Sequence, residues 1–302
     1  FLKMFKNILI VGCGLIGSSI LRASINKKIS KNFFVYEKSK KNIREIKKIN
    51  KKIIILKKLD NKISDMDFVI IATPMSQYER IILHLNKHLS KKSLITDVGS
   101  TKENVSKLKN NSLLKSLDWI MSHPISGSEV SGPKYGSKSL FINKWCIVFR
   151  DKNKIKQKKL VNFWKKIGSK VIIMDEKVHD KIFSITSHLP HLIAYNLIKT
   201  AQDFQKTQKK DVIKFSAGGL RDFSRIAASN EIMWRDIFFN NKKNVVIAIN
   251  LFIKNLKSFK KNIQNLDDKT LRKKLVNSKK VRQQILNLKQ DIAKPDFGRD
   301  LN

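Results

Sequence analysis

A glycine-rich stretch near the start of the chain has the residue types and spacing of a phosphate-binding turn. It lies between an apolar run and a helical pattern and reads Gly12, Cys13, Gly14, Leu15, Ile16, Gly17. Gly12 permits a tight turn, Gly14 lets the backbone approach a diphosphate, and Gly17 allows a helix to pack closely on a strand. The stretch therefore predicts a dinucleotide-binding turn, to which we assign every residue except the cysteine. A glycine-rich turn without a ligand is the alternative.

Glu37 follows Gly17 by 20 residues, at the end of the next apolar run. An acid at this distance is typical of a residue that binds the 2′-hydroxyl of an adenosine ribose, and it would repel a 2′-phosphate. The expected cofactor is therefore NAD rather than NADP, although neighbouring lysines oppose this preference. A solvated carboxylate is the alternative for Glu37. Thr73 and Pro74 end another apolar run and are expected to line the site near the nicotinamide ribose.

A histidine in a loop of small residues could serve as a general base. His123 is followed by Pro124 and then by serines, glycines and Glu129. A neutral imidazole accepts a proton readily near neutral pH, so the expected rate rises with pH through an ionisation near that of free histidine. Ser100 ends another apolar run and opens a helical pattern. It is expected to serve as an active-site hydroxyl, or alternatively as a helix cap.

The second half of the chain adds histidines and arginines of the kind that bind carboxylates. His188 and His191 flank Leu-Pro, Arg221 and Arg225 lie in an Arg-Asp-Phe-Ser-Arg run, and Arg235 follows near the start of a helical pattern. An arginine pairs bidentately with a carboxylate, and such a group could belong to a substrate or to the neighbouring aspartates. The residues alone do not choose between these partners.

The elements that must position these residues differ between the two halves. In residues 1–175, short apolar runs alternate with amphipathic stretches, which predicts a Rossmann-type doubly wound α/β sheet. The expected strands are Ile8–Val11, Phe33–Tyr36, Ile53–Leu56, Phe68–Ala72, Leu94–Val98, Trp119–Met121, Cys146–Phe149 and Val171–Met174, and the expected helices are Leu15–Ile25, Lys40–Ile49, Tyr78–Leu89 and Lys102–Leu114. Residues 176–302 show helical spacing instead, over Asp180–Phe204, Ile232–Ser258 and Leu271–Ile292. An all-helical C-terminal domain is therefore expected, for substrate binding and dimerisation.

Composition narrows the class of protein. The 302 residues carry 63 Lys+Arg and 24 Asp+Glu, a formal net charge of +39. The excess is mostly dispersed lysine without interleaved aromatics, so no specific nucleic-acid partner is expected, although the charge would attract anionic substrates. The chain has only two cysteines, which cannot form a disulfide framework, and so few cysteines fit a protein of the reducing cytoplasm. We expect no metal site. No apolar run is long enough for a membrane span, so no membrane partner is expected.

Four motifs in order along the chain resemble the prephenate dehydrogenase family, which includes the arogenate-using and cyclohexadienyl variants. They are the Gly-Ser-Thr-Lys turn at 99–102, the His-Pro loop at 122–133, Ser-His-Leu-Pro-His at 187–191 and Arg-Asp-Phe-Ser-Arg at 221–225. The resemblance implies that His123 is the catalytic base and that Ser100 binds the substrate hydroxyl. It also implies that Arg225 binds a substrate carboxylate, while His191, Glu129 and Trp234 belong to or border the substrate pocket.

The family's reaction explains these residue types. Prephenate is an anionic cyclohexadienol, and its oxidation by NAD releases carbon dioxide and gives 4-hydroxyphenylpyruvate, a step of tyrosine biosynthesis. We expect a homodimeric enzyme that performs this reaction. The alternatives are an arogenate dehydrogenase, a Rossmann-type dehydrogenase similar to the β-hydroxyacid dehydrogenases, and a basic nucleotide- or nucleic-acid-binding protein without catalysis.

Overall fold

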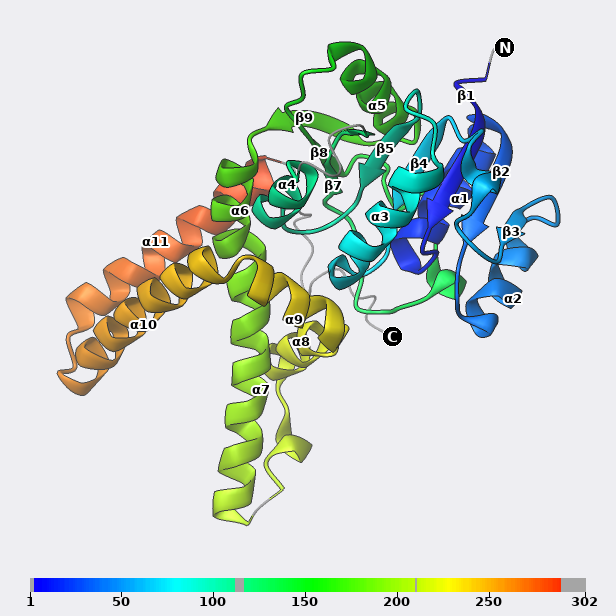
Figure 1. The fold of residues 1–302 in the computed structure, drawn as a ribbon. Coiled ribbons are helices and arrows are strands. Elements are labelled where there is room, and N and C mark those ends of the chain that lie inside the picture. Colours follow the sequence, from blue (N-terminus) through cyan, green and yellow to red (C-terminus); the bar gives the residue numbers. More distant parts are fainter. Residues whose placement is uncertain (1–2, 112–116, 210, 289–302) are drawn as a thin grey trace. The chain divides into compact units, whose positions relative to one another are not determined.

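The computed structural model describes residues 3–111, 117–209 and 211–288, and its first half is built on a parallel sheet (Figure 1). The strands are β1 (Phe5–Val11), β2 (Ser30–Tyr36), β3 (Ile54–Leu56), β4 (Phe68–Ile71), β5 (Leu94–Asp97) and β6 (Asp118–Trp119). They pair in the order β3-β2-β1-β4-β5-β6, and every pair is parallel. The chain reverses its direction of winding beside β1, where such sheets bind ligands.

Helices cover both faces of this sheet because both faces are apolar. Alternate residues of β1 enter two separate cores: Ile8 and Ile10 belong to one and Leu9 and Val11 to the other. All four are fully buried. The helices of this half are α1 (Leu15–Asn26), α2 (Lys40–Ile49), α3 (Tyr78–His88), α4 (Glu103–Lys109) and α5 (Lys154–Lys166). The doubly wound α/β class is therefore confirmed, and residues 112–114 of the expected fourth helix lie outside the described residues.

The last two expected strands of this half do not join the large sheet, and they pair instead with a short strand that was not expected. The strands β7 (Ser122–Pro124), β8 (Trp145–Phe149) and β9 (Lys170–Met174) form a second sheet in that order. In it β7 runs antiparallel to β8, and β8 runs parallel to β9. The transition occurs at Met121, two residues after β6 ends, whose carbonyl accepts the N–H of Phe149 at 3.1 Å. This change of partner places His123 opposite Ile147 of β8.

The chain is helical after β9. Its helices are α6 (Glu176–Phe183), α7 (Leu189–Gln208), α8 (Gly218–Ala227), α9 (Glu231–Asn240), α10 (Lys242–Gln264) and α11 (Asp268–Asn287). A π-helical turn at Ser184–His188 joins α6 to α7, just before Pro190, which has no N–H to donate to the preceding turn. The expected helix over Ile232–Ser258 breaks at Asn241. Of the expected helix Leu271–Ile292, residues 289–292 lie outside the described residues.

The chain divides into two compact units, residues 1–245 and 246–302. The first contains both sheets and every helix up to the start of α10. The second contains the rest of α10 together with α11, and it exposes many large apolar side chains, among them Leu251, Leu256, Ile263, Leu275 and Val281. Among the described residues, no helix combines the length and the apolar character that a membrane crossing requires.

Candidate active site

A cavity of about 850 Å³ opens at the carboxyl ends of β1, β2 and β4. The lining includes Gly12, Gly14, Glu37, Thr73 and Pro74, so these predicted cofactor residues lie together. Three others do not line the cavity: Leu15 and Ile16 begin α1, and Gly17 packs below the turn.

Each glycine of the turn meets a different constraint. Gly12 has a φ of +84°, and a Cβ there would lie 2.6 Å from Thr73 Cγ2. A Cβ on Gly17 would lie 2.3 Å from the carbonyl oxygen of Gly12, so α1 packs against the turn only with glycine at this position. A Cβ on Gly14 would meet nothing within 4 Å, and Gly14 borders the cavity. The open space over Gly14 is therefore where a phosphate group would approach the backbone.

Glu37 is anchored to the glycine turn. Its Oε2 accepts the N–H of Cys13 at 3.0 Å and its Oε1 accepts the N–H of Ser39 at 2.9 Å. Each carboxylate oxygen keeps a further lone pair for a ribose hydroxyl. Burial raises the pKa of the Cys13 thiol far above its usual range, which leaves this cysteine protonated and unreactive. The turn and its acid therefore fit the adenosine ribose and the diphosphate of a dinucleotide.

His123 is the first member of a buried chain of hydrogen bonds. Its Nδ1 lies 2.8 Å from Nε2 of His179, and Nδ1 of His179 lies 2.7 Å from Oδ1 of Asp180. The side chains of His179 and Asp180 are 0% exposed. Asp180 can only accept, so Nδ1 of His179 carries a proton and its Nε2 accepts one from Nδ1 of His123. The chain thereby leaves the lone pair of His123 on Nε2.

Backbone groups hold Asp180 at the end of this chain. The N–H of Lys102 donates to both carboxylate oxygens, at 2.9 and 3.0 Å, and the N–H of Glu103 donates to Oδ2 at 2.9 Å. These donors lie at the start of α4, where N–H groups have no partner within the helix. Asn241 donates to the carbonyl oxygen of Asp180 at 2.7 Å. Two separate segments therefore hold Asp180: the start of α4 fixes its carboxylate, and Asn241 fixes its backbone.

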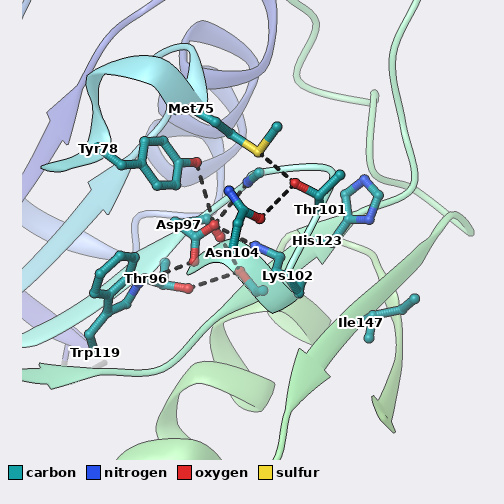
Figure 2. A network of polar contacts seen from close by, with 12 residues as sticks. Met75, Tyr78, Thr96, Asp97, Thr101, Lys102, Asn104, Trp119, His123 and Ile147 are labelled. Carbon is teal, nitrogen blue, oxygen red and sulfur yellow. Dashed lines mark hydrogen bonds and ion pairs between the residues drawn. The ribbon is translucent and has the colours of Figure 1, made fainter. Parts of the chain in front are cut away.

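A buried ion pair supports the same region (Figure 2). The ammonium of Lys102 pairs with Oδ2 of Asp97 at the end of β5, and both side chains are 0% exposed. Asp97 also accepts Trp119 Nε1–H at 3.1 Å and the N–H of Gly99 at 3.0 Å. Its carbonyl oxygen accepts the hydroxyl of Ser122, which directly precedes His123. The pair therefore ties the end of β5 to β7.

The surroundings of His123 hold its imidazole neutral. Burial lowers its pKa well below the usual range, and the nearby His179, Lys102 and His188 lower it further. The sequence suggested an ionisation near that of free histidine, whereas this environment places the ionisation of His123 below it. A buried imidazole gains no bulk-water solvation for its charged form, so it stays unprotonated to lower pH.

Ser100 lies half-buried in the turn between β5 and α4. The cap of α4 is Lys102, so the interpretation of Ser100 as a helix cap is wrong. The hydrogen bond of His123 goes to His179, and none joins it to Ser100 in the described structure. The hydroxyl of the neighbouring Thr101 donates to Asn104 Oδ1 at 2.8 Å and also lies 3.3 Å from Sδ of Met75, which is next to Pro74 in the cavity wall (Figure 2). This contact links the base region to the cofactor cavity.

A second group of rings brings together three residues from α9 and the Ser-His-Leu-Pro-His motif. His191 stacks on Trp234 with ring centroids 3.7 Å apart, and His188 lies edge-on to Trp234 at 6.3 Å. Nδ1 of His188 faces the amide of Asn241 at 3.1 Å, while His188 Nε2 and Trp234 Nε1 are buried without a partner among the described residues. Unpaired buried donors are rare, so these two N–H groups fit the acceptor atoms of a ligand.

Arg225 and Glu129, which the sequence assigned to the substrate pocket, are neighbours. Nη1 of Arg225 on α8 lies 3.6 Å from Oε2 of Glu129, and both side chains are partly exposed. The alternative that the arginines pair with adjacent aspartates holds for Arg235, which pairs with Asp236, whereas Arg225 pairs with Glu129.

Sequence reasoning missed His179, Asp180, Lys102 and Asp97. A His-Asp dipeptide at the first helix after β9 was the available signal for two of them. No group of three or more His, Cys, Asp or Glu side chains suited to a metal ion occurs within residues 3–111, 117–209 and 211–288.

Comparison with known proteins gives one consistent family. Residues 23–173 match the description "Prephenate dehydrogenase, nucleotide-binding domain", and residues 175–277 match "Prephenate dehydrogenase, dimerization domain". A cyclohexadienyl dehydrogenase of Zymomonas mobilis is 30% identical over 292 residues, which cover 96% of this chain and 98% of that protein. A prephenate dehydrogenase of Bacillus subtilis is 30% identical over 298 residues, with 98% of this chain and 80% of that protein covered.

A solved structure supports the same assignment. Prephenate dehydrogenase from A. aeolicus, crystallised in complex with hydroxyphenyl propionate and NAD+, superimposes with a TM-score of 0.86 at 32% identity. The superposition covers 93% of this chain and 98% of that chain. The motifs quoted from the sequence, the order of a parallel sheet followed by helices, and these matches agree, and the chain belongs to the prephenate dehydrogenase family.

Proposed function

We propose that this protein catalyses the NAD-dependent oxidative decarboxylation of prephenate to 4-hydroxyphenylpyruvate in tyrosine biosynthesis. The observation that carries the proposal is the orientation of His123, whose lone pair is fixed on Nε2 by His179 and Asp180. Glu37, anchored beside the glycine turn, favours NAD over NADP because its carboxylate would repel a 2′-phosphate.

His123 would first accept a proton from the substrate and later return it to the product. Its Nε2 would accept the proton of the ring hydroxyl as that carbon becomes a carbonyl, and bound NAD would supply the hydride acceptor for the same carbon. Loss of the ring carboxylate as carbon dioxide returns an electron pair to the ring, and the resulting phenolate oxygen takes the proton back from His123. The reaction therefore balances without a net proton, and aromatisation drives it forward. The protein's contribution is orientation and electrostatic matching.

The chain offers separate groups for the two substrate carboxylates. Arg225, held near Glu129, would pair with one of them, and the unpartnered N–H groups of His188 and Trp234 would donate to the other end of the substrate. The stacked ring of His191 would complete the wall of this pocket. Ser100 would donate to the substrate hydroxyl. Arogenate, with an amine in place of the keto group, is the second candidate substrate, favoured by the cyclohexadienyl dehydrogenase relative.

The C-terminal part supports a role in assembly. We propose that residues 1–175 form the cofactor domain and that residues 176–302 provide substrate contacts and a symmetric homodimer interface. The matched dimerization description and the exposed apolar side chains of α10 and α11 support the dimer. A cytoplasmic enzyme is consistent with the two free buried cysteines.

The test is steady-state NADH formation with prephenate and with arogenate, each with NAD and NADP. His123→Asn should lower kcat by ~10²–10⁴-fold with little change in NAD affinity, because the lost group acts on a proton in the transition state. His88→Asn, at a partly exposed histidine outside the site, is the matched control. An unchanged kcat in His123→Asn would show that another group is the base. Faster turnover of arogenate than of prephenate would show that arogenate is the preferred substrate.

A further inference from the structure

Three successive residues of α9 make three different contacts. Trp234 is buried against His188 and His191. Arg235 lines the cofactor cavity, as does Ile232 one turn earlier. Asp236 is buried and accepts a hydrogen bond from the N–H of Ser76, another residue that lines that cavity. This helix therefore forms a wall of the cofactor cavity, although it lies outside the residues that the glycine motif identifies.

Asp236 ties α9 to the loop that follows β4. Its Oδ2 accepts the N–H of Ser76 at 3.1 Å, and Ser76 follows shortly after Pro74 in the cavity lining. Burial raises the pKa of Asp236, but hydrogen bonds from Arg235 and Ser76 outweigh this effect and hold the pKa below its usual range. The carboxylate is therefore ionised and available to hold a cation.

That cation is the guanidinium of Arg235. Oδ1 of Asp236 accepts from Nη2 at 2.7 Å and from Nε at 3.2 Å. The side chain of Arg235 remains 52% exposed. Within the described residues, no hydrogen bond or ion pair occupies its Nη1. The guanidinium is thus oriented by Asp236 and keeps donors for a ligand in the cavity.

We propose that Arg235 binds the diphosphate of the dinucleotide cofactor and that Asp236 is the positioning residue for this contact. The diphosphate is the anionic part of NAD, and a guanidinium forms paired hydrogen bonds with phosphate oxygens. The turn around Gly14 offers backbone N–H groups to the same anion. Lys38, Lys58 and Arg80 also line the cavity, but none is held by a carboxylate in the described structure, so each would lose more side-chain freedom on binding.

The proposal rests on the proposed function only in that the cofactor is a dinucleotide. It concerns binding, so its experiment needs no turnover of any substrate. Titration calorimetry of the full chain would use NAD, ADP-ribose, which retains the diphosphate, and adenosine, which lacks it. The variants are Arg235→Ala, Arg235→Lys and Asp236→Asn. Arg272→Ala is the matched control, because Arg272 pairs with Asp268 on an exposed helix face.

Arg235→Ala should weaken NAD and ADP-ribose alike by roughly tenfold to a hundredfold, the range for charge-assisted hydrogen bonds, and leave adenosine unchanged. Asp236→Asn and Arg235→Lys should each lose less. The affinity of the wild type should fall more steeply with salt than that of Arg235→Ala, a difference that a purely structural role would not produce. Because Arg235→Ala leaves a buried carboxylate unpaired, the double variant with Asp236→Asn repeats the measurement.

Unchanged NAD affinity in both Arg235 variants would overturn the proposal. An equal loss for adenosine and ADP-ribose would overturn it too, because the effect would then not involve the diphosphate. If NAD affinity depends on Arg235 but prephenate is not oxidised, the proposed function falls and this contact stands.

Discussion

Replacing Asp180 by Asn should reverse the hydrogen-bond chain that orients the base. The carboxylate accepts from His179 at 2.7 Å and from the N–H groups of Lys102 and Glu103 at 2.9 to 3.0 Å. An asparagine would turn its oxygen to the two backbone donors and its NH₂ group to His179. His179 would then accept at Nδ1 and donate from Nε2 to His123. The proton of His123 would move to Nε2, and the base would have no free lone pair toward the substrate.

The magnitude follows from what recovery of the active tautomer would cost. With the original tautomers restored, the NH₂ group of the asparagine and the Nδ1–H of His179 would face each other without acceptors. Both positions are fully buried. Each unsatisfied donor costs about 1–3 kcal/mol, or about 2–6 kcal/mol for the two. Because 1.4 kcal/mol corresponds to a factor of ten, kcat should fall by roughly 30-fold to 10⁴-fold. The corresponding change in a serine protease triad has an effect near the upper end of this range.

Two measurements test this reasoning. Steady-state kcat of Asp180→Asn is compared with that of Asp203→Asn, which removes an exposed carboxylate paired with Lys199 and should change nothing. Nitrogen NMR of histidine-labelled protein reports the tautomer directly, and the unprotonated nitrogen of His123 should change from Nε2 to Nδ1. A folded Asp180→Asn protein with kcat within threefold of the wild type, or with the wild-type tautomer, would refute the hydrogen-bond argument.

Further predictions concern the glycine turn and pH. Gly17→Ala should destabilise the fold, because its Cβ would lie 2.3 Å from the carbonyl oxygen of Gly12, whereas Gly14→Ala should fold normally and lose NAD affinity in calorimetry. The acid limb of kcat/KM should lie below pH 6.5, because burial lowers the pKa of His123, and a limb at or above 6.5 would contradict this. Burial also lowers the pKa of His188 from 6.5 to about 4. The unfolded chain therefore binds a proton that the folded chain does not, and the free energy of unfolding should fall between pH 6.5 and 4, by up to about 3 kcal/mol from this residue. Urea unfolding across this range should show a shallower dependence in His188→Gln.

Local pattern was sufficient to predict the first half of the fold. The four apolar residues at the end of β1 are buried on two faces, and this is visible in the sequence as an unbroken apolar run before the glycine turn. The second sheet was not predictable in the same way. Strand β7 has three residues and includes Pro124, so its pairing depends on contacts with β8 rather than on its own pattern.

The candidate site likewise has a part that local sequence predicts and a part that it does not. Gly12, Gly14 and Glu37 directly follow the strands that position them, so their spacing in the sequence was enough to predict that they lie in one site. His179 and Asp180 lie more than 50 residues after His123, and their contact depends on how the first helix after β9 packs. A His-Asp pair in a helix is common on protein surfaces, so nothing local distinguishes this one as buried.

Burying the ion pair of Lys102 and Asp97 near the base costs desolvation free energy, and the reason for it lies in where the two residues are placed. Lys102 and Asp97 are fully buried, and a buried ion pair is often no more stable than well-packed apolar residues of similar size. Here, however, the side chain of Lys102 joins β5 while its backbone N–H joins Asp180. One residue thus fixes the carboxylate that sets the tautomer of His123 and places a positive charge that lowers its pKa. An apolar pair at these positions could fill the same volume, but it would remove the carboxylate that accepts from Trp119 and Gly99, and it would remove the positive charge that helps to keep the base free of protons.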